Sequence, residues 1–216
     1  MLAISFWFVV KTPETVYQTA KTEQLLIQLP DASEVLLDEN SKLVLDADWS
    51  EERQLKLEGE AFFKVEKGKP FIVVLPEGEV QVLGTSFRVE TTVDELEVAC
   101  YSGKIKVNYR KSSEVLNPGD QARAEKADKL EVKRGKQIQR ADNQETILRF
   151  QSRPLAEVFK AMELHFKVKI QFPVSDTRTY TGFFKTADLK EALKTVCVPM
   201  SLDYTIKDKT VTITKK

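Results

Sequence analysis

The sequence of 216 residues has one histidine and two cysteines, and these small numbers exclude several kinds of site. Because His165 is the only histidine, neither a histidine pair for a metal ion nor an HExxH zinc motif is possible. Cys100 and Cys197 form no CxxC or metal-type spacing, and the apolar residues around them favour buried structural thiols. They fall in different predicted domains, so we do not expect a disulfide between them.

The chain also lacks an excess of charge of either sign. Lys and Arg total 33, as do Asp and Glu, so the formal net charge is zero. A nucleic-acid-binding surface normally shows an unpaired basic stripe, so we do not expect nucleic acid as a partner.

Sequence motifs of the common active sites are missing as well. There is no GxSxG, GxGxxG or GxxxxGK[ST] sequence, so we expect no enzyme and assign no catalytic, cofactor-binding or metal site. The segment Gly84-Thr85-Ser86 lies between two strand-like segments with no histidine nearby, and we interpret Gly84 as a bend or bulge.

No apolar run is long enough to span a bilayer. Residues 2–10 are strongly apolar, but a spanning helix needs about 20 residues. No basic residue precedes them and no small-residue cleavage site follows, which is unlike a signal peptide. We interpret residues 1–16 as the remnant of a truncated transmembrane helix or a leader; the alternative is a first strand buried in the core.

Short segments of alternating apolar residues fill the chain from residue 17 to residue 134. Phe63 and Val65 share one face of the segment 57–65, and the same alternation recurs along the following segments. Turn residues such as those of Asn117-Pro-Gly-Asp120 separate them. So many strands with no helical period between them predict an all-β domain, and the absence of a sequence repeat leaves a sandwich, a barrel and a solenoid open.

The composition changes after residues 135–145, which are polar and predict a linker. Leu155, Val158, Phe159 and Met162 then recur at helical spacing, so a helix is expected to begin at Pro154. Residues 189–196 predict a second helix. Strands are expected at 146–150, 168–172, 180–185, 201–206 and 211–214. Residues 146–216 therefore predict a small α+β domain with two helices packed on a sheet.

These motifs resemble the FecR-type anti-sigma regulators. Residues 57–65 are similar to the GEAFF-like segment of that family, and residues 80–89 to its VLGTxFxV-like segment. Residues 101–107 and 116–121 fit the later strands of the family. The tail resembles the secretin and TonB-receptor short N-terminal domain, and the matching segments are Phe150 with Pro154-Leu155, Tyr180-Thr-Gly-Phe183, 189–193, Leu202-Asp-Tyr204 and Val211-Thr-Ile213.

The resemblance implies a mainly β fold with an α+β domain at its carboxyl end. The FecR-like domain, residues 17–134, is then an elongated solenoid-like or sandwich-like structure, and the family favours the solenoid. Ala32 stands where the family usually has glycine in a Pro-Asp-Gly-Ser turn. A left-handed backbone would strain alanine, so we expect a type I turn without a left-handed residue there.

The resemblance also implies a function in signalling. Family members are anchored to the inner membrane, and their periplasmic part receives a signal from the periplasmic signalling domain of an outer-membrane TonB-dependent transporter for siderophores or glycans. They relay it to an extracytoplasmic-function sigma factor, which is bound by a cytoplasmic region absent from this chain. The membrane would be reached through the helix represented by residues 1–16. No cofactor is implied.

We hypothesise that the partner docks at the edge of the last sheet. The strand Val211–Thr214 is expected to leave an unpaired edge to which a partner strand adds, with Lys215 and Lys216 as guards against indiscriminate pairing. The predicted interaction residues are Tyr204, Ile206, Val211, Thr212 and Ile213.

Two alternative functions remain open. A carbohydrate-binding accessory module would use exposed aromatic residues such as Trp49, Tyr101 or Tyr109. A secretin-like assembly subunit is suggested by the tail alone.

Overall fold

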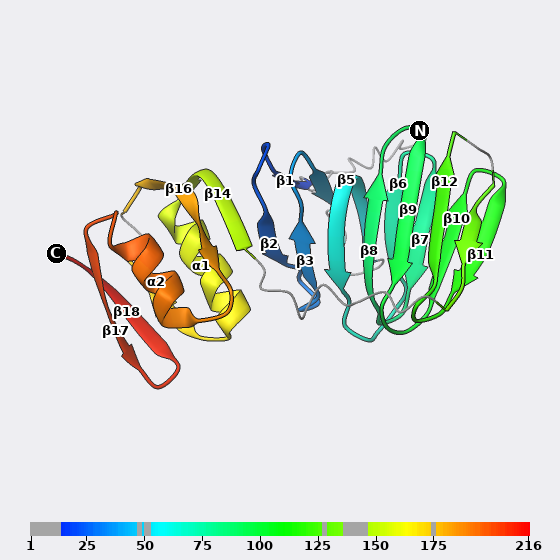
Figure 1. Cartoon of the computed structure of the whole chain (residues 1–216). Coiled ribbons are helices and arrows are strands. Elements are labelled where there is room, and N and C mark those ends of the chain that lie inside the picture. Colours follow the sequence, from blue (N-terminus) through cyan, green and yellow to red (C-terminus); the bar gives the residue numbers. More distant parts are fainter. Residues whose placement is uncertain (1–13, 47–48, 50–52, 127–128, 136–146, 174–175) are drawn as a thin grey trace, which may run out of the picture.

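The computed structural model describes residues 14–46, 49, 53–126, 129–135, 147–173 and 176–216. An all-β unit is followed by a smaller unit with two helices, and each unit has a hydrophobic core of its own (Figure 1). The predicted fold class, mainly β with a carboxyl-terminal α+β part, is confirmed. Residues 1–13 of the predicted leader and 136–145 of the predicted linker lie outside the described residues.

The first unit consists of short strands joined by tight turns. They are β1 (Thr15–Gln18), β2 (Leu25–Gln28), β3 (Glu34–Leu37), β4 (Lys42–Leu45), β5 (Arg53–Lys64), β6 (Phe71–Leu75), β7 (Gly78–Val82), β8 (Ser86–Thr91), β9 (Glu95–Cys100), β10 (Ile105–Tyr109), β11 (Ser112–Leu116), β12 (Gln121–Glu125) and β13 (Glu131–Lys133). The segment 57–65 lies almost entirely within the single long strand β5, which begins at Arg53.

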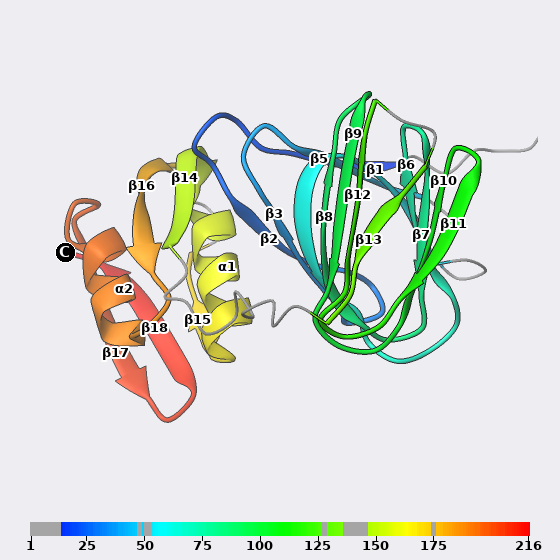
Figure 2. The same ribbon diagram turned by 45° about the vertical axis from the view of Figure 1, so that its right-hand side comes forward.

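The long strand β5 belongs to two layers. One layer has the order β1-β4-β5-β6-β7-β10-β11, and the other has the order β2-β3-β5-β8-β9-β12-β13 (Figure 2). The first half of β5 pairs with β4 and β6, and its second half pairs with β3 and β8. The change occurs at Gly59, whose φ of 94° is a left-handed conformation. Next to it, Glu60 N donates a 2.8 Å hydrogen bond to Ser41 Oγ.

Antiparallel pairing decides between the two architectures that the family resemblance left open. Among the strands of this unit that the structure describes, β5 and β6 are the one pair that runs in parallel. A solenoid stacks strands from successive turns in parallel, so the solenoid favoured by the resemblance is wrong and the sandwich-like alternative is correct.

The predicted alternation places the expected residues inside the sandwich. Phe63, Phe87 and Phe71 are fully buried at its centre, with the Phe63 and Phe87 rings stacked at 4.8 Å between centroids. Cys100 and Cys197 are buried free thiols, as predicted, in the first and second core respectively. Burial raises the pKa of each thiol to about 11, so neither is a reactive nucleophile at neutral pH.

The second unit contains two helices and two small sheets. Its elements are β14 (Ile147–Pro154), α1 (Leu155–Phe166), β15 (Lys169–Gln171), β16 (Thr179–Lys185), α2 (Leu189–Cys197), β17 (Leu202–Lys207) and β18 (Thr210–Lys215). Strands β14 and β16 form one sheet, and the other has the order β15-β18-β17. Asp188 caps α2 by accepting a hydrogen bond from Glu191 N. Neither described helix has the length and apolar character needed to cross a membrane.

The turn between β2 and β3 corrects one prediction. Ala32 has a φ of 66°, so the residue is left-handed despite its side chain. Ala32 N donates to Leu29 O, and Leu29 N donates to Ser33 O, which closes a short hairpin loop. A turn at Pro30-Asp31 followed by a left-handed residue is a common three-residue hairpin loop, and that loop requires the left-handed conformation whichever residue occupies it.

Replacing Ala32 by glycine is therefore expected to stabilise the protein by about 0.5 to 1 kcal/mol. Removing the left-handed strain gains about 1–2 kcal/mol, and the added freedom of glycine in the unfolded chain costs about 0.4–1 kcal/mol. Ala32 is exposed, so no packing is lost. Urea unfolding measures the change. The matched control is Ala187→Gly, since Ala187 is exposed without a left-handed backbone. A midpoint for Ala32→Gly at or below that of the wild type would contradict the assignment.

Candidate protein-interaction site

The predicted docking strand β18 is not an edge. It lies between β17, with which it pairs antiparallel, and β15, with which it pairs in parallel over Thr210–Thr212. The expectation of an unpaired edge along 211–214 is therefore wrong for Val211 and Thr212, which pair with β15. The sequence predicted a strand at 168–172 but carried no signal that this strand would lie beside the last one.

The five predicted interaction residues separate into three groups in the structure. Val211 and Ile213 are core residues with exposed fractions of 0% and 3%. Thr212 is on the outer face, where its Oγ1 donates a 3.2 Å hydrogen bond to Gln171 Oε1. Tyr204 and Ile206 are half-buried on β17 and pack against the second core. Only the last group lies on a strand with an open side.

Strand β17 has an open edge, because among the described strands it pairs with β18 alone. Two residues, Asp208 and Lys209, join the two strands, so the adjoining pair Lys207–Thr210 is in hydrogen-bonding register. Backbone groups alternate in direction along an antiparallel strand. The backbone N–H and C=O groups of Tyr204 and Ile206 therefore point away from β18, toward the open edge.

A second open edge is β16, which pairs only with β14. On it Phe184 is fully buried, whereas Phe183 is 51% exposed on the outer face. Phe183 was not predicted as a surface residue. The alternation of a strand was the available signal, since it places two consecutive phenylalanines on opposite faces.

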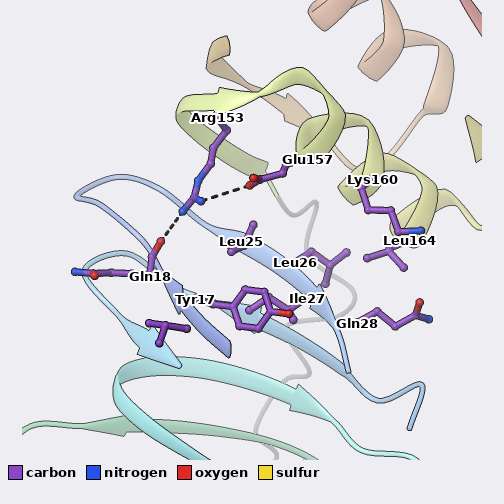
Figure 3. A pocket seen from close by; sticks show the side chains of 11 residues that line it. Tyr17, Gln18, Leu25, Leu26, Ile27, Gln28, Arg153, Glu157, Lys160 and Leu164 are labelled. Atoms are coloured by element: carbon purple, nitrogen blue, oxygen red, sulfur yellow. Dashed lines mark hydrogen bonds and ion pairs between the residues drawn. The ribbon is translucent and has the colours of Figure 1, made fainter. Parts of the chain in front are cut away.

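The two units meet beside β2 and α1. Leu26 and Leu36 extend from the outer side of their strands and pack against the core of the second unit. Gln24 N donates a 3.0 Å hydrogen bond to Arg149 O across the boundary. Next to these contacts lies a groove of about 470 Å³ between β1, β2 and α1, with Tyr17, Leu26 and Leu164 among its lining residues (Figure 3).

An ion pair between the units lies at one end of this groove. Arg153 Nε is 2.5 Å from Glu23 Oε1. Arg153 also donates to Gln18 O and pairs with Glu157 Oε2 at 3.4 Å (Figure 3). The Glu23 side chain is only 3% exposed. Burial alone would raise the pKa of Glu23, but hydrogen bonds from Arg153 and Ala20 N, together with the Arg153 charge, lower it below the ordinary value.

The aromatic residues proposed for sugar binding do not form an exposed platform. Tyr109 is 1% exposed, inside the first core. Trp49 is half-buried against that core, with its ring edge on Phe71. Tyr101 is half-buried and packs on Phe62 at 5.7 Å between ring centroids. This arrangement gives no support to a carbohydrate-binding module.

His165 and the segment Gly84–Thr85, both considered as possible functional sites from the sequence, have structural roles instead. His165 Nε2 lies 3.0 Å from Thr186 O. Gly84 lies in a bend, as predicted, and a Cβ there would come within 2.9 Å of Lys67 Cα. Thr85 beside it is 3% exposed, and its hydroxyl donates to Lys104 O. Within the described ranges, no group of three or more His, Cys, Asp or Glu side chains is placed to hold a metal ion.

Two sequence models of one protein family match the chain. The sequence model described as "FecR protein" matches residues 15–106, and the one described as "FecR, C-terminal" matches residues 147–213. The two matches together cover most of both units. The chain belongs to the FecR family. In this FecR protein the second match contains the edge strands β16 and β17 as well as Arg153.

Solved structures share the fold. Two crystal structures of a candidate anti-sigma factor from Parabacteroides distasonis, at 1.65 and 2.50 Å resolution, are similar to this FecR protein with TM-scores of 0.56 and 0.57. They are 22% and 23% identical to it, and each alignment covers 94% of this chain and 99% or 100% of the other. The comparison with curated proteins gave no match.

Proposed function

We propose that this FecR protein is the sensor part of an anti-sigma regulator and acts by protein–protein binding, without catalysis. It lies in the periplasm, anchored to the inner membrane through its amino-terminal region. Its partner is the periplasmic signalling domain of an outer-membrane TonB-dependent transporter, and the signal passes to an extracytoplasmic-function sigma factor. The matches to both FecR models and the fold shared with a candidate anti-sigma factor support this proposal.

The open edge of β17 is the observation that carries the docking mechanism. Its outward backbone groups belong to Tyr204 and Ile206, whose side chains are held against the core. A rigid edge of this kind can accept a strand from the partner through main-chain hydrogen bonds. Of the interaction residues predicted from the sequence, these two therefore supply the contact, whereas Val211 and Ile213 hold the sheet in place from inside.

A pair of variants at Ile206 tests strand addition. Ile206→Pro removes the outward N–H and obstructs an incoming strand, yet proline is tolerated on the solvent side of an edge strand. Ile206→Ala is the matched control, because it shortens the same side chain and keeps the N–H. We expect Ile206→Pro to bind the purified transporter signalling domain at least about tenfold more weakly than Ile206→Ala. Calorimetry measures both affinities, and circular dichroism checks the folding of each variant.

Two outcomes would count against this mechanism. Equal affinities of the two folded variants would mean that the partner does not add to β17. Weaker binding by a Phe183→Ser variant, with Ile206→Pro unchanged, would move the contact to β16. Failure of the wild-type chain to bind any transporter signalling domain would refute the proposed partner itself.

A further inference from the structure

We propose that Glu23 and Arg153 form a clamp that holds the two units in one orientation, and that the chain has a second, open arrangement when this clamp is broken. This clamp is a property of the chain by itself, whatever partner it binds.

Hydrogen bonds from both units hold the Glu23–Arg153 ion pair in one position. The Glu23 carboxylate accepts hydrogen bonds from Ala20 N at 2.9 Å within its own unit, and from Arg153 Nε and Nη2 at 2.5 and 3.2 Å from the other unit. Gln151 N lies 3.4 Å from Glu23 Oε1. Arg153 Nη2 also donates to Gln18 O, in β1. Glu23 and Arg153 therefore each contact backbone of the other unit as well as each other.

The groove beside the ion pair leaves the orientation of the two units to depend strongly on this polar contact. The apolar part of the interface includes Leu26 and Leu36, and the groove of about 470 Å³ beside them interrupts the packing between β2 and α1. A groove of this size leaves surface between the units uncovered, so the interface gains less from burial than a closely packed one would. In contrast, removing one partner of a buried ion pair leaves an uncompensated charge, which favours separation of the two surfaces.

The consequence is a two-state device. In the closed form, the ion pair and the Gln24–Arg149 backbone hydrogen bond hold the second unit against β2. In the open form, Glu23 and Arg153 are both hydrated, and the second unit turns away from the sandwich. A ligand or protein that binds the two forms with different affinity would shift their populations. The clamp thus provides a physical route by which binding at one unit changes the arrangement of the whole chain.

Distance measurement between spin labels tests this directly. Labels are placed at Lys106→Cys on β10 and Thr205→Cys on β17, both exposed positions. The native thiols are buried, so they do not compete for the label. We expect a single narrow distance distribution for the parent chain. Glu23→Gln, which keeps the shape of the side chain and removes its charge, is expected to raise the open population at least about tenfold.

The control is Glu157→Gln, which removes the other carboxylate that pairs with Arg153. The Glu157 side chain is 48% exposed and lies outside the clamp, so this variant should keep the parent distribution. Arg153→Gln serves as an independent variant if Glu23→Gln does not fold. Its distribution should match that of Glu23→Gln, and the double variant should add nothing further. An unchanged distribution in a folded Glu23→Gln or Arg153→Gln variant would overturn the proposal.

Discussion

Replacing Arg53 by methionine is expected to lower the free energy of unfolding by about 3 to 5 kcal/mol, which is the usual cost of breaking a buried ion pair. Arg53 is 7% exposed at the start of β5. Its Nη1 donates to Asp31 Oδ2 at 2.8 Å and to Glu66 O at 2.9 Å, and its Nη2 donates to Lys69 O. The guanidinium also lies over the Phe71 ring, 5.6 Å from its centroid.

One side chain thus joins two turns to the sandwich. Methionine fills similar volume but leaves the Asp31 carboxylate without its cation and both carbonyl groups without their donor. Asp31 in turn accepts hydrogen bonds from Ser33 N and Ser33 Oγ, so the hairpin containing Ala32 is weakened as well. We expect the loss of stability to appear in the equilibrium free energy of unfolding in urea.

The matched control is Arg88→Met. Arg88 also pairs with carboxylates, Glu60 at 2.5 Å and Glu90 at 3.0 Å, but its side chain is 33% exposed on the outer face of the second layer. Ion pairs that remain in contact with solvent contribute less than buried ones, so the control should lose clearly less stability than Arg53→Met. Equal losses for Arg53→Met and Arg88→Met would show that burial of Arg53 has no special importance.

Replacing Gly59 by alanine is expected to destabilise the protein by about 2 to 5 kcal/mol. A left-handed conformation costs a residue with a Cβ about 1–2 kcal/mol, and steric overlap in a packed region adds about 1–3 kcal/mol. Gly59 has a φ of 94°, and a Cβ on it would lie 2.4 Å from Ser41 Oγ and 2.9 Å from Ser41 Cα. The Ser41 backbone must move to admit it, at the point where β5 passes from one layer to the other.

Gly135 offers a control that separates these two effects. It has a φ of 66°, but nothing lies within 4 Å of a Cβ built on it. Gly135→Ala therefore measures backbone strain alone and should cost about 1–2 kcal/mol. The difference between the two variants in urea unfolding gives the contribution of the close approach to Ser41. If Gly59→Ala cost no more than Gly135→Ala, the tight contact would not restrain the structure.

The faces of the strands and helices were predictable because they follow from local periods. A strand turns alternate side chains to opposite faces, so Phe63, Val80 and Phe87 could be placed in the core without knowing the pairing of their strands. The helix that buries Val158 and Met162 follows from apolar residues at helical spacing. The family motifs also lie within continuous segments, and both FecR matches bear them out.

The turn at Ala32 shows where reasoning from residue preference fails. Because alanine has a Cβ, the sequence predicted no left-handed residue at position 32. The hairpin between β2 and β3 nevertheless requires one there. The pairing of two buried strands stabilises far more than the local strain costs, so the tertiary structure overrides the preference of a single residue.

The sequence by itself determined the alternation of faces along most strands and helices and the family to which the chain belongs, since both depend on residues close together along it. Only the tertiary structure decided which strand is an edge and which charges meet. β18 became a central strand because β15 returned beside it. Glu23 and Arg153 became partners across 130 positions of sequence. Such contacts depend on which finished surfaces come together, and no local pattern encodes that.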